Sequence, residues 1–544
     1  MLPSNERPKT GCILERLSPF LIAGVVLVVY LNSLGGPFIF DDLPSIRDNP
    51  SIRCLWPLTV PLNPPPRNAM QGRSLFNLSM AVNYALGGLD PWGYHAGNVL
   101  LHILTSLVLY GVVRRTFITE RLRARFGQHA AGLALAAVMI WSVHPLITST
   151  VTYISSRTEI LMGLFYLSTL YCFIRAADSP RNASANWTMA SIVACALGMA
   201  SKEVTVSAPL IVWLYDRIFM SGSFAEALRR RRGLYAGLAA TWLVLVVASA
   251  GTTFSVRRGG GAPFTVWEYA LTQSQVIVHY LRLSFWPSGL VLDYYDWPVA
   301  HFSFALVASL AIVLGLLAVT TEAVLSRKPV GILGALVFMV LAPTSSFLPL
   351  LGEVATERRM YLPLAAVTVL LVVVAWRALQ AAGSRWAPAI CAALTVATLG
   401  AFAIQRNEDY RSALIIWSDT AAKRPNNARA LTEVGTALMT QGRFSEAIGY
   451  YERAIRVRPD YGMAYSNWGV ALAMQGKCSE AAGKLSEALR QNPVSASAHY
   501  NLGLVLAKQG HLQQAAVEYR LALQIDPSFT KARDGLAGLQ IVRG

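Results

Sequence analysis

The chain has 544 residues, of which 54% are hydrophobic and only 14% are charged. Soluble domains carry about 25% charged residues, so these figures exclude a wholly soluble protein, and the abundant apolar residues exclude a disordered one. The net charge is +17, but the basic residues lie between apolar runs, which indicates membrane topology rather than nucleic-acid binding. Six scattered cysteines predict neither a disulfide framework nor a zinc site.

Eleven apolar runs approach the roughly 17–25 residues that a membrane-spanning helix needs. They are 18–34, 96–113, 131–149, 159–174, 188–200, 203–219, 234–252, 301–320, 329–343, 360–376 and 387–404. The first run follows basic residues and precedes no small-residue cleavage site, so we expect it to remain as an anchor.

The distribution of Lys and Arg between the spans predicts their orientation, because cytoplasmic loops are enriched in both. With the N-terminus in the cytoplasm, the basic loops 114–125, 175–181, 217–232, 327–328 and 377–385 all fall on the inner side. An odd number of spans then places the C-terminal region outside.

The segment 253–300 is only weakly apolar and does not fit a span. We expect an outer loop with an interfacial helix at roughly 265–286, because Tyr and Trp favour the headgroup level. Its expected anchors are Trp267, Tyr269, Tyr280 and Trp286. If this helix spans the membrane instead, the C-terminal region is inside.

The C-terminal part of the chain repeats with a period of 34, as the four prolines Pro425, Pro459, Pro493 and Pro527 illustrate. A period of 34 with small residues at helix contacts is the tetratricopeptide pattern, in which helix pairs stack into a solenoid. The predicted domains are a membrane domain at 1–404, a linker or degenerate repeat at 405–427, repeats at 428–461, 462–495 and 496–529, and a partial repeat at 530–544.

Ionisable residues near membrane spans are costly, so they usually mark function or pairing. In the predicted topology the conspicuous ones share the outer ends of the spans, as a single polar cavity requires. They are Asp41, Asp42, His95, His102, His144, Arg157, Glu159, Lys202, Glu203, Arg257, Arg258, Asp293, Asp296, Glu353, Glu357, Arg358 and Arg359. The structural alternatives are a loop end or helix cap for the Asp41–Asp42 pair, a helix terminus for His144, a hydrogen bond within the bundle for His102, and ion pairs with each other or with neighbours for Lys202, Glu203, Glu357 and Arg358.

Several motifs in this set carry a family resemblance. They are FIFDD at 38–42, NYALGGLDPWGYHAGNVLLH at 83–102, SVHP at 142–145, SKE at 201–203 and ERRMYLP at 357–363. With them the chain resembles a bacterial-type member of the transmembrane and tetratricopeptide-repeat O-mannosyltransferases, which belong to the GT-C superfamily. It departs from that pattern after Arg73, where Ser replaces the usual Pro.

The resemblance implies an all-α fold, with a polytopic GT-C-like helix bundle followed by a tetratricopeptide solenoid. It also implies an inverting transfer of mannose or another hexose from a polyprenyl-phosphate carrier to an acceptor, expected to be a Ser or Thr hydroxyl of a protein. Asp41 is the expected general base, with Asp42 as its orienter or as the second choice.

The leaving phosphate requires cations, and we expect Arg358, Lys202 and Arg157 to bind it, ahead of Arg257 and Arg258. The remaining candidates for the site are His144, Glu159, Glu203 and Glu357. We expect no cofactor, although the paired aspartates also suit a divalent metal ion, which prefers oxygen ligands.

Asn467 and Asn501 recur at one repeat position on first helices, where they are candidates to hold an acceptor peptide in the groove. A helix–helix contact is the structural alternative. The expected partners are therefore the lipid-linked sugar, an acceptor protein and the lipid bilayer, with no nucleic acid.

Two other functions compete with sugar transfer: a membrane-anchored repeat scaffold without catalysis, and a transporter or flippase. For location, the bacterial inner membrane is favoured, with a cytoplasmic N-terminus and periplasmic repeats. In a eukaryote the endoplasmic reticulum membrane is expected instead.

Overall fold

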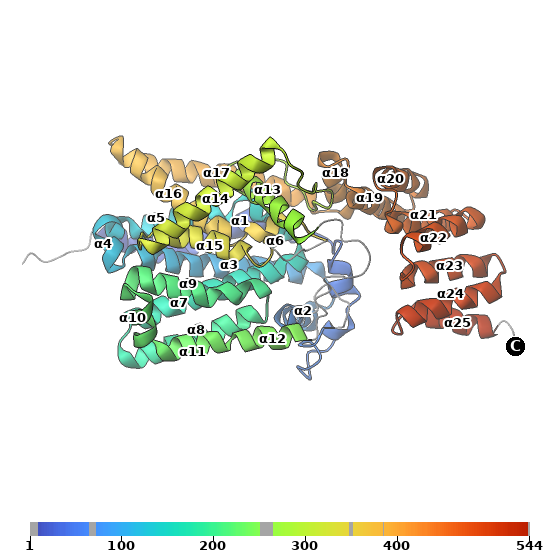
Figure 1. Ribbon diagram of the computed structural model, residues 1–544, viewed down its shortest axis with the longest axis horizontal. Helices are drawn as coiled ribbons and strands as arrows, with labels where there is room; N and C mark the ends of the chain where they lie inside the picture. Colours follow the sequence, from blue (N-terminus) through green and yellow to red (C-terminus); the bar gives the residue numbers. More distant parts are fainter. Residues whose placement is uncertain (1–8, 65–71, 251–264, 347–351, 385, 542–544) are drawn as a thin grey trace, which may run out of the picture. The chain divides into compact units, whose positions relative to one another are not determined.

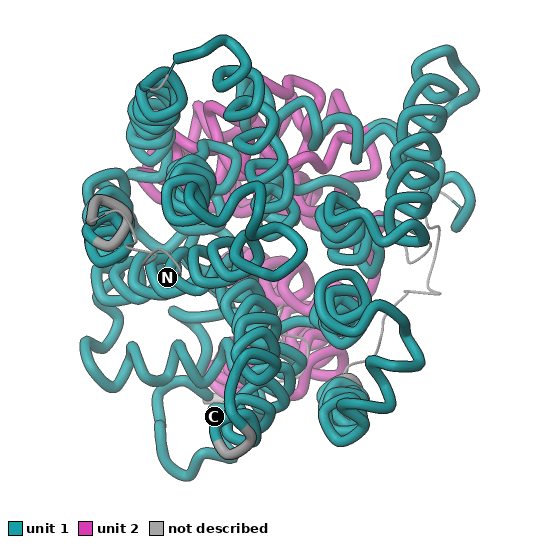
Figure 2. Tube along the Cα trace, turned by 90° about the vertical axis from the view of Figure 1, so that its left-hand side faces the viewer, with its two compact units in different colours: residues 1–290, 298–411 teal, residues 291–297, 412–544 magenta. Residues whose placement is uncertain are grey.

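Apolar runs dominate the first part of the chain, and they fold into helices because a helix satisfies every backbone hydrogen bond internally. The computed structural model describes residues 9–64, 72–250, 265–346, 352–384 and 386–541, and these residues contain helices and no strand. They form two compact units, 1–290 with 298–411 (unit 1) and 291–297 with 412–544 (unit 2), coloured separately in Figure 2. The expected all-α fold is confirmed.

Unit 1 is a helix bundle (Figure 1). Its α-helices are α1 (Lys9–Tyr30), α2 (Ser74–Gly87), α3 (Pro91–Phe117), α4 (Glu120–Phe126), α5 (Ala130–Ser142), α6 (Thr148–Thr152), α7 (Arg157–Asp178), α8 (Arg181–Met199), α9 (Ala208–Asp216), α10 (Phe224–Arg230), α11 (Arg232–Ala240), α12 (Trp242–Ala250), α13 (Val266–Phe285), α14 (Phe304–Leu325), α15 (Gly331–Leu341), α16 (Pro363–Ala381) and α17 (Ala387–Asp409).

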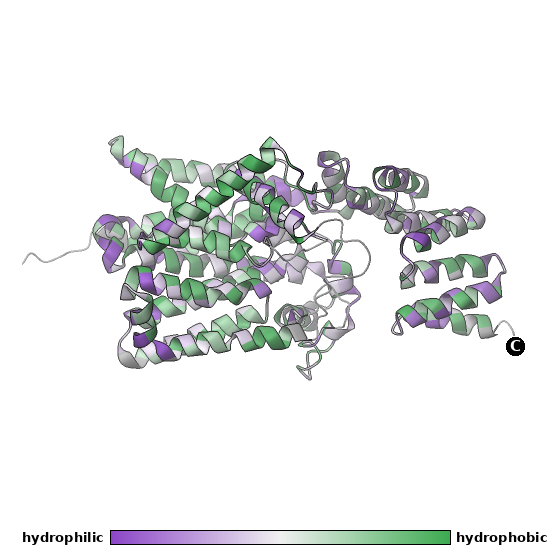
Figure 3. Ribbon diagram, viewed as in Figure 1, coloured by the Kyte–Doolittle hydropathy of each residue, from purple (hydrophilic) through white to green (hydrophobic). Residues whose placement is uncertain are grey.

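The described residues include 7 helices that are long and apolar enough to cross a membrane, or up to 9 if each of two bent pairs is one span. Two shorter apolar helices, Ala183–Met199 and Gly331–Leu341, coincide with the predicted runs 188–200 and 329–343. The chain is therefore a multi-pass membrane protein, and Figure 3 shows its apolar helices in green. The count of eleven spans stays a prediction.

The loops predicted on the inner side contact one another. The Arg121 guanidinium donates to the carbonyl of Ile218 at 2.6 Å, and that of Arg327 donates to the carbonyl of Gly222 at 2.9 Å. Arginines placed this way satisfy carbonyl groups that helix ends leave without partners. These loops thus share one end of the bundle, and the leaflet in which that end lies stays a prediction.

Helix α13 covers the interfacial helix predicted at 265–286, but two of its expected anchors are buried. Trp267 and Trp286 are exposed, whereas Tyr269 and Tyr280 are fully buried. The Tyr269 hydroxyl donates to the carbonyl of Thr344 at 3.0 Å, and the Tyr280 hydroxyl accepts the N–H of Thr356 at 2.7 Å. The prediction that Tyr269 and Tyr280 anchor the helix in the lipid interface is wrong, because both rings are buried and each satisfies its hydroxyl inside the bundle.

Unit 2 is a stack of helix pairs, which confirms the tetratricopeptide fold. Its helices are α18 (Ala413–Lys423), α19 (Ala428–Thr440), α20 (Phe444–Val457), α21 (Gly462–Met474), α22 (Cys478–Gln491), α23 (Ala496–Lys508), α24 (Leu512–Ile525) and α25 (Thr530–Ile541). The repeated glycines allow the close approach of paired helices: a Cβ on Gly435 would lie 2.5 Å from the Tyr451 ring, and one on Gly469 would lie 2.6 Å from Leu485.

Candidate active site

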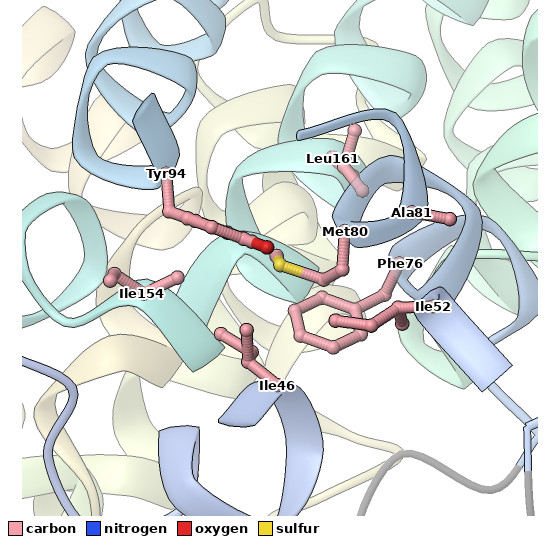
Figure 4. Close-up of a cluster of buried hydrophobic side chains, with 8 residues drawn as sticks. All are labelled: Ile46, Ile52, Phe76, Met80, Ala81, Tyr94, Ile154 and Leu161. Carbon is pink, nitrogen blue, oxygen red and sulfur yellow. The ribbon is translucent and has the colours of Figure 1, made fainter. Parts of the chain in front are cut away.

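The loop that follows α1 carries Asp41 and Asp42, and apolar anchors hold it against the bundle. Ile46 and Ile52 are fully buried and pack with Phe76 and Met80 of α2 in the cluster of Figure 4. Burying such side chains contributes about 1.5–3 kcal/mol each relative to leaving them exposed. The position of the two aspartates is therefore fixed by packing only a few residues away.

Asp42 ties this loop to the short helical turn Ile154–Ser156. Its side chain is 1% exposed. One carboxylate oxygen accepts the backbone N–H of Ser155 at 2.8 Å and the Ser155 hydroxyl, and the other accepts the N–H of Ile39 at 3.0 Å. Burial raises the pKa of Asp42 to about 7, against the lowering effect of these hydrogen bonds.

Asp41 is only partly buried, in contrast to its neighbour. Its backbone N–H donates to the hydroxyl of Tyr153 at 2.9 Å. The preceding residue, Phe40, has a φ of +49°, a left-handed conformation that costs a bulky residue about 1–3 kcal/mol and is typical of functional sites. The backbone on which the Asp41 carboxylate is carried is therefore constrained by the Phe40 conformation and by the hydrogen bond to Tyr153.

Tyr153 connects the aspartates to Arg358. Burial raises the pKa of Tyr153, the charges of Asp41 and Asp42 raise it further, and the charge of Arg358 opposes them. The four side chains are therefore within electrostatic reach of one another. The sequence analysis missed Tyr153, and its position beside buried hydroxyl residues in TVTYISS was the only available signal.

Arg358 forms an ion pair with Glu353. Burial alone would raise the pKa of Glu353, but the neighbouring guanidinium groups of Arg358 and Arg359 lower it to about 2. Burial lowers the pKa of Arg358, but this effect is outweighed by the nearby groups Glu353, Tyr153 and Asp41, so the pKa is raised overall. Arg358 is thus a permanent cation close to the expected base.

Lys202 and Glu159 form a second ion pair, with side chains only 8% and 2% exposed. Lys202 has an extended backbone and directly precedes the turn Glu203–Ser207. Removing either partner would leave an uncompensated buried charge, which is strongly destabilising. The Coulombic neighbours of Glu203 include Arg73 and Lys202, so the predicted SKE motif carries a dense group of charges.

The structure brings five of the predicted site residues together from separate segments, along with Tyr153 and Glu353. We define the polar cluster as Asp41, Asp42, Tyr153, Glu159, Lys202, Glu353 and Arg358, which interact through the hydrogen bonds, ion pairs and Coulombic contacts given above. It combines a partly accessible carboxylate with two cations. This arrangement can accept a proton and neutralise a developing anion.

Two predicted residues have structural duties close to the polar cluster. Arg157 is 2% exposed, and its guanidinium donates to the Asn98 and Asn83 side chains and to the carbonyl of Tyr94. His144 accepts the N–H of Leu146 at Nδ1, and its Nε2 lies 3.2 Å from the carbonyl of Ser284, so it caps the turn Pro145–Ile147. That helix-terminus role is the alternative that the sequence left open.

The remaining predicted residues lie elsewhere or outside the described residues. Glu357 is buried and electrostatically close to Tyr410 at the end of α17. Asn467 donates to the Thr436 hydroxyl of the preceding repeat at 3.0 Å, a helix–helix contact, and Asn501 occupies the equivalent position on α23. Arg257 and Arg258 fall in 251–264, outside the described residues.

The part of the chain that the structure describes contains no obvious metal-binding site. There, no three His, Cys, Asp or Glu side chains are grouped so that they could hold a metal ion. Asp42 already accepts three hydrogen bonds, and the expectation that the chain needs no cofactor stays a prediction.

Two protein families match the chain. The family described as dolichyl-phosphate-mannose-protein mannosyltransferase matches residues 75–250, and the tetratricopeptide repeat family matches 405–462 and 466–528. The first match includes Glu159 and Lys202 of the polar cluster, whereas Asp41 and Arg358 lie outside it.

Curated relatives match over most of this chain. Protein O-mannosyl-transferase Tmtc3 of Drosophila melanogaster is 27% identical over 83% of this chain and 57% of its own length. Protein O-mannosyl-transferase TMTC3 of Homo sapiens is 25% identical over 80% and 51%, and TMTC4 of Mus musculus is 27% identical over 80% and 66%. The chain thus spans between half and two thirds of the length of these relatives.

Several solved structures, tetratricopeptide-repeat domains among them, match about a fifth to a quarter of the chain. The first TPR domain of the human RPAP3 protein is 23% identical and covers 21% of this chain and 91% of that domain, with a TM-score of 0.21. The Arabidopsis OM64 TPR domain is 20% identical, covers 21% of this chain and 93% of that domain, and has a TM-score of 0.20.

Proposed function

We propose that this chain, a member of the transmembrane and tetratricopeptide-repeat O-mannosyltransferase family, transfers mannose or another hexose from a polyprenyl-phosphate carrier to Ser or Thr hydroxyls of proteins. The observation that carries the proposal is the juxtaposition, within the polar cluster, of the Asp41 carboxylate and the Arg358 cation, both of which are partly accessible. A transferase for this reaction needs both groups at one place, because a proton leaves the acceptor while negative charge develops on the donor phosphate.

Asp41 acts as the general base in this mechanism. It takes the proton of the acceptor hydroxyl as that oxygen forms a bond to the anomeric carbon of the sugar. The bond between the anomeric carbon and the phosphate oxygen breaks with its electrons on the phosphate, so the configuration inverts. A positioned base contributes about 10²–10⁴ to the rate. Asp42 is a positioning residue, since its hydrogen bonds to Ser155 and Ile39 hold the loop in place.

Arg358 and Lys202 bind the phosphate. Each is already paired with a carboxylate, Glu353 and Glu159 respectively, so its charge is kept within the bundle before the donor arrives. Charged donors in a water-poor site stabilise a developing anion strongly. Arg157 supports the same site indirectly, because its hydrogen bonds join α2, α3 and α7 behind Asp42.

The tetratricopeptide array supplies the acceptor-binding surface. Stacked helix pairs form extended concave surfaces that suit peptides. Asn501 is the better candidate of the predicted pair to contact a peptide backbone, because the Asn467 amide donates to Thr436 inside the array. The reaction takes place at the extracytoplasmic face, in the bacterial inner membrane or, in a eukaryote, in the endoplasmic reticulum membrane.

The test is incubation of the purified chain in lipid nanodiscs with polyprenyl-phosphate mannose and Ser/Thr peptides, with products read by mass spectrometry. We expect hexose transfer by the unaltered chain and by Asp48→Asn, a control at an exposed carboxylate seven residues away. We expect transfer by Asp41→Asn to fall at least about 100-fold. Undiminished transfer by Asp41→Asn would reassign the base, and no transfer from any hexose donor would favour a non-catalytic scaffold.

A further inference from the structure

The short segment Val291–Trp297 belongs to unit 2, although it lies in the chain between two helices of unit 1, α13 and α14. Figure 2 colours it with the repeat array for this reason. Within unit 2 the segment has no helix of its own and packs against residues that are more than 120 positions later in the chain. It therefore contacts the array as a bound peptide would.

Both acids of the segment are held by the start of the array. Asp293 pairs with Arg429 at 2.9 Å and accepts the side-chain amide of Asn427 at 3.0 Å. Asp296 pairs with Arg424. The side chains in these two ion pairs are only 11–21% exposed, so they are partly shielded from solvent. Asn427 also caps α19 through its side-chain oxygen, which fixes its amide toward Asp293.

The aromatic rings of the segment meet the same arginines. The Tyr295 ring lies 3.9 Å from the guanidinium carbon of Arg429 and 5.0 Å from that of Arg458, and its centroid is 5.7 Å from that of Tyr461. Arg424 lies 5.0 Å from the Tyr294 ring and 5.6 Å from the Trp297 ring. Cation–π contacts of this kind favour aromatic residues flanked by acids.

This basic set is not a general property of the repeats. One period after Arg429 the chain has Met463, and two periods after it Ser497. Arg458 is itself one period after Arg424, but one period after Arg458 the chain has Asn492. A role in stacking the repeats would predict arginine at each of these equivalent positions. The arginines are confined to the end of the array where the segment lies, which indicates recognition rather than repeat packing.

We propose that the start of the array, with Arg424, Asn427, Arg429 and Arg458, is a receptor for an extended acidic and aromatic peptide, and that Asp293–Trp297 is its built-in ligand, which a partner segment of the same chemistry displaces. The proposal is independent of the sugar-transfer proposal. An intramolecular ligand acts at an effective concentration on the order of millimolar, so it fills the surface even at modest intrinsic affinity. An outside peptide binds strongly only when the built-in ligand is weakened.

The test measures binding of a fluorescent peptide with the sequence LDYYDWP, residues 292–298, to the full-length chain. We expect weak binding to the unaltered chain and at least tenfold tighter binding to the double variant Asp293→Asn with Asp296→Asn. Adding Arg429→Gln to that variant should abolish the gain, and a peptide with Asn at both acidic positions should bind at least tenfold more weakly. Equal affinity for the unaltered chain and the double variant, or affinity that does not depend on Arg429, would overturn the proposal.

Two controls separate recognition from folding. Glu487→Gln breaks an ion pair with Arg490 in the next repeat and should leave peptide binding unchanged. The exchange Asp293→Arg with Arg429→Asp restores opposite charges, so its unfolding temperature should lie closer to that of the unaltered chain than the unfolding temperature of Arg429→Asp alone does. If the exchange lowers the unfolding temperature as much as Arg429→Asp alone does, the proposed pairing is contradicted.

Discussion

Asp41 and Asp42 are adjacent in the chain, yet their environments differ, and this difference supports the roles that we propose for them. Asp42 is buried and accepts three hydrogen bonds, whereas Asp41 is partly accessible. The sequence predicted the pair as a site but left open which residue is the base. The choice depends on Ser155, which lies 113 positions away and has no recognisable signal in the sequence.

The raised pKa of Asp42 predicts a pH-dependent stability. Because burial raises this pKa to about 7, the folded chain holds a proton there that the unfolded chain has released above pH 4. The stability that this proton contributes is complete below the unfolded pKa and is lost as the pH rises through 7. Relative to Asp42→Asn, which does not titrate, the unaltered chain should lose about 1 kcal/mol between pH 6 and 8.

Thermal unfolding of both proteins from pH 5.5 to 8.5 measures this difference. We expect the unfolding temperature of Asp42→Asn to rise relative to that of the unaltered chain as the pH increases. A constant difference across the range would show that Asp42 does not titrate there.

Arg358 should determine how efficiently the lipid-linked sugar donor reacts. Arg358→Gln should lower kcat/KM for the lipid-linked sugar by about 10²–10³, because it removes a charged donor from the site of the developing anion. Arg358→Lys should retain part of the activity, since a point charge remains but the planar fork is lost. The control Arg411→Gln alters an exposed ion pair with Glu408 and should stay within twofold of the unaltered chain. Equal activity of Arg358→Gln and the control would exclude Arg358 from the site.

At the scale of the helices, the sequence predicted the elements well where the signal is local. Each of the eleven apolar runs coincides with a helix or a bent helix pair, because length and hydropathy are properties of a continuous segment. The 54° bend at His144-Pro145 follows from proline, which lacks the N–H needed to continue a helix. The burial of Tyr269 and Tyr280 was not predictable, since it depends on Thr344 and Thr356 from other segments.

The glycines of the repeats provide a test at the same scale. Gly469→Ala should destabilise the array, because the new Cβ would lie 2.6 Å from Leu485 and 3.1 Å from the carbonyl oxygen of Ala481. Gly483→Ala, on the second helix of the same repeat, meets open space and should stabilise the array by about 0.5–1 kcal/mol through helix propensity. Chemical denaturation of the two variants compares them directly, and the same sign for both would contradict the packing argument.

At the scale of the whole molecule, the alternation of basic and polar loops predicted which loops share an end of the bundle. Contacts such as Arg121 to Ile218 join predicted inner loops, while the polar cluster joins predicted outer ones. The incorporation of 291–297 into unit 2 was not predictable, because its ion pairs join residues 128 and 136 positions apart.

The predicted orientation has a labelling test. In a background without other cysteines, the exposed Cys54 of the aspartate-bearing loop should react with a membrane-impermeant maleimide in intact cells or vesicles of native orientation. Ser326→Cys, in the predicted inner loop after α14, should react only after permeabilisation. Reaction of both positions from the same side would contradict the predicted topology.

The central claim is that Asp41 performs the chemistry while other residues of the polar cluster bind the donor. The most direct measurement compares donor binding and sugar transfer in one preparation of Asp41→Asn. The account predicts an affinity for polyprenyl-phosphate mannose within about twofold of the unaltered chain, with transfer to peptide reduced at least about 100-fold. Transfer at the unaltered rate, or a loss of transfer explained entirely by lost donor binding, would contradict it.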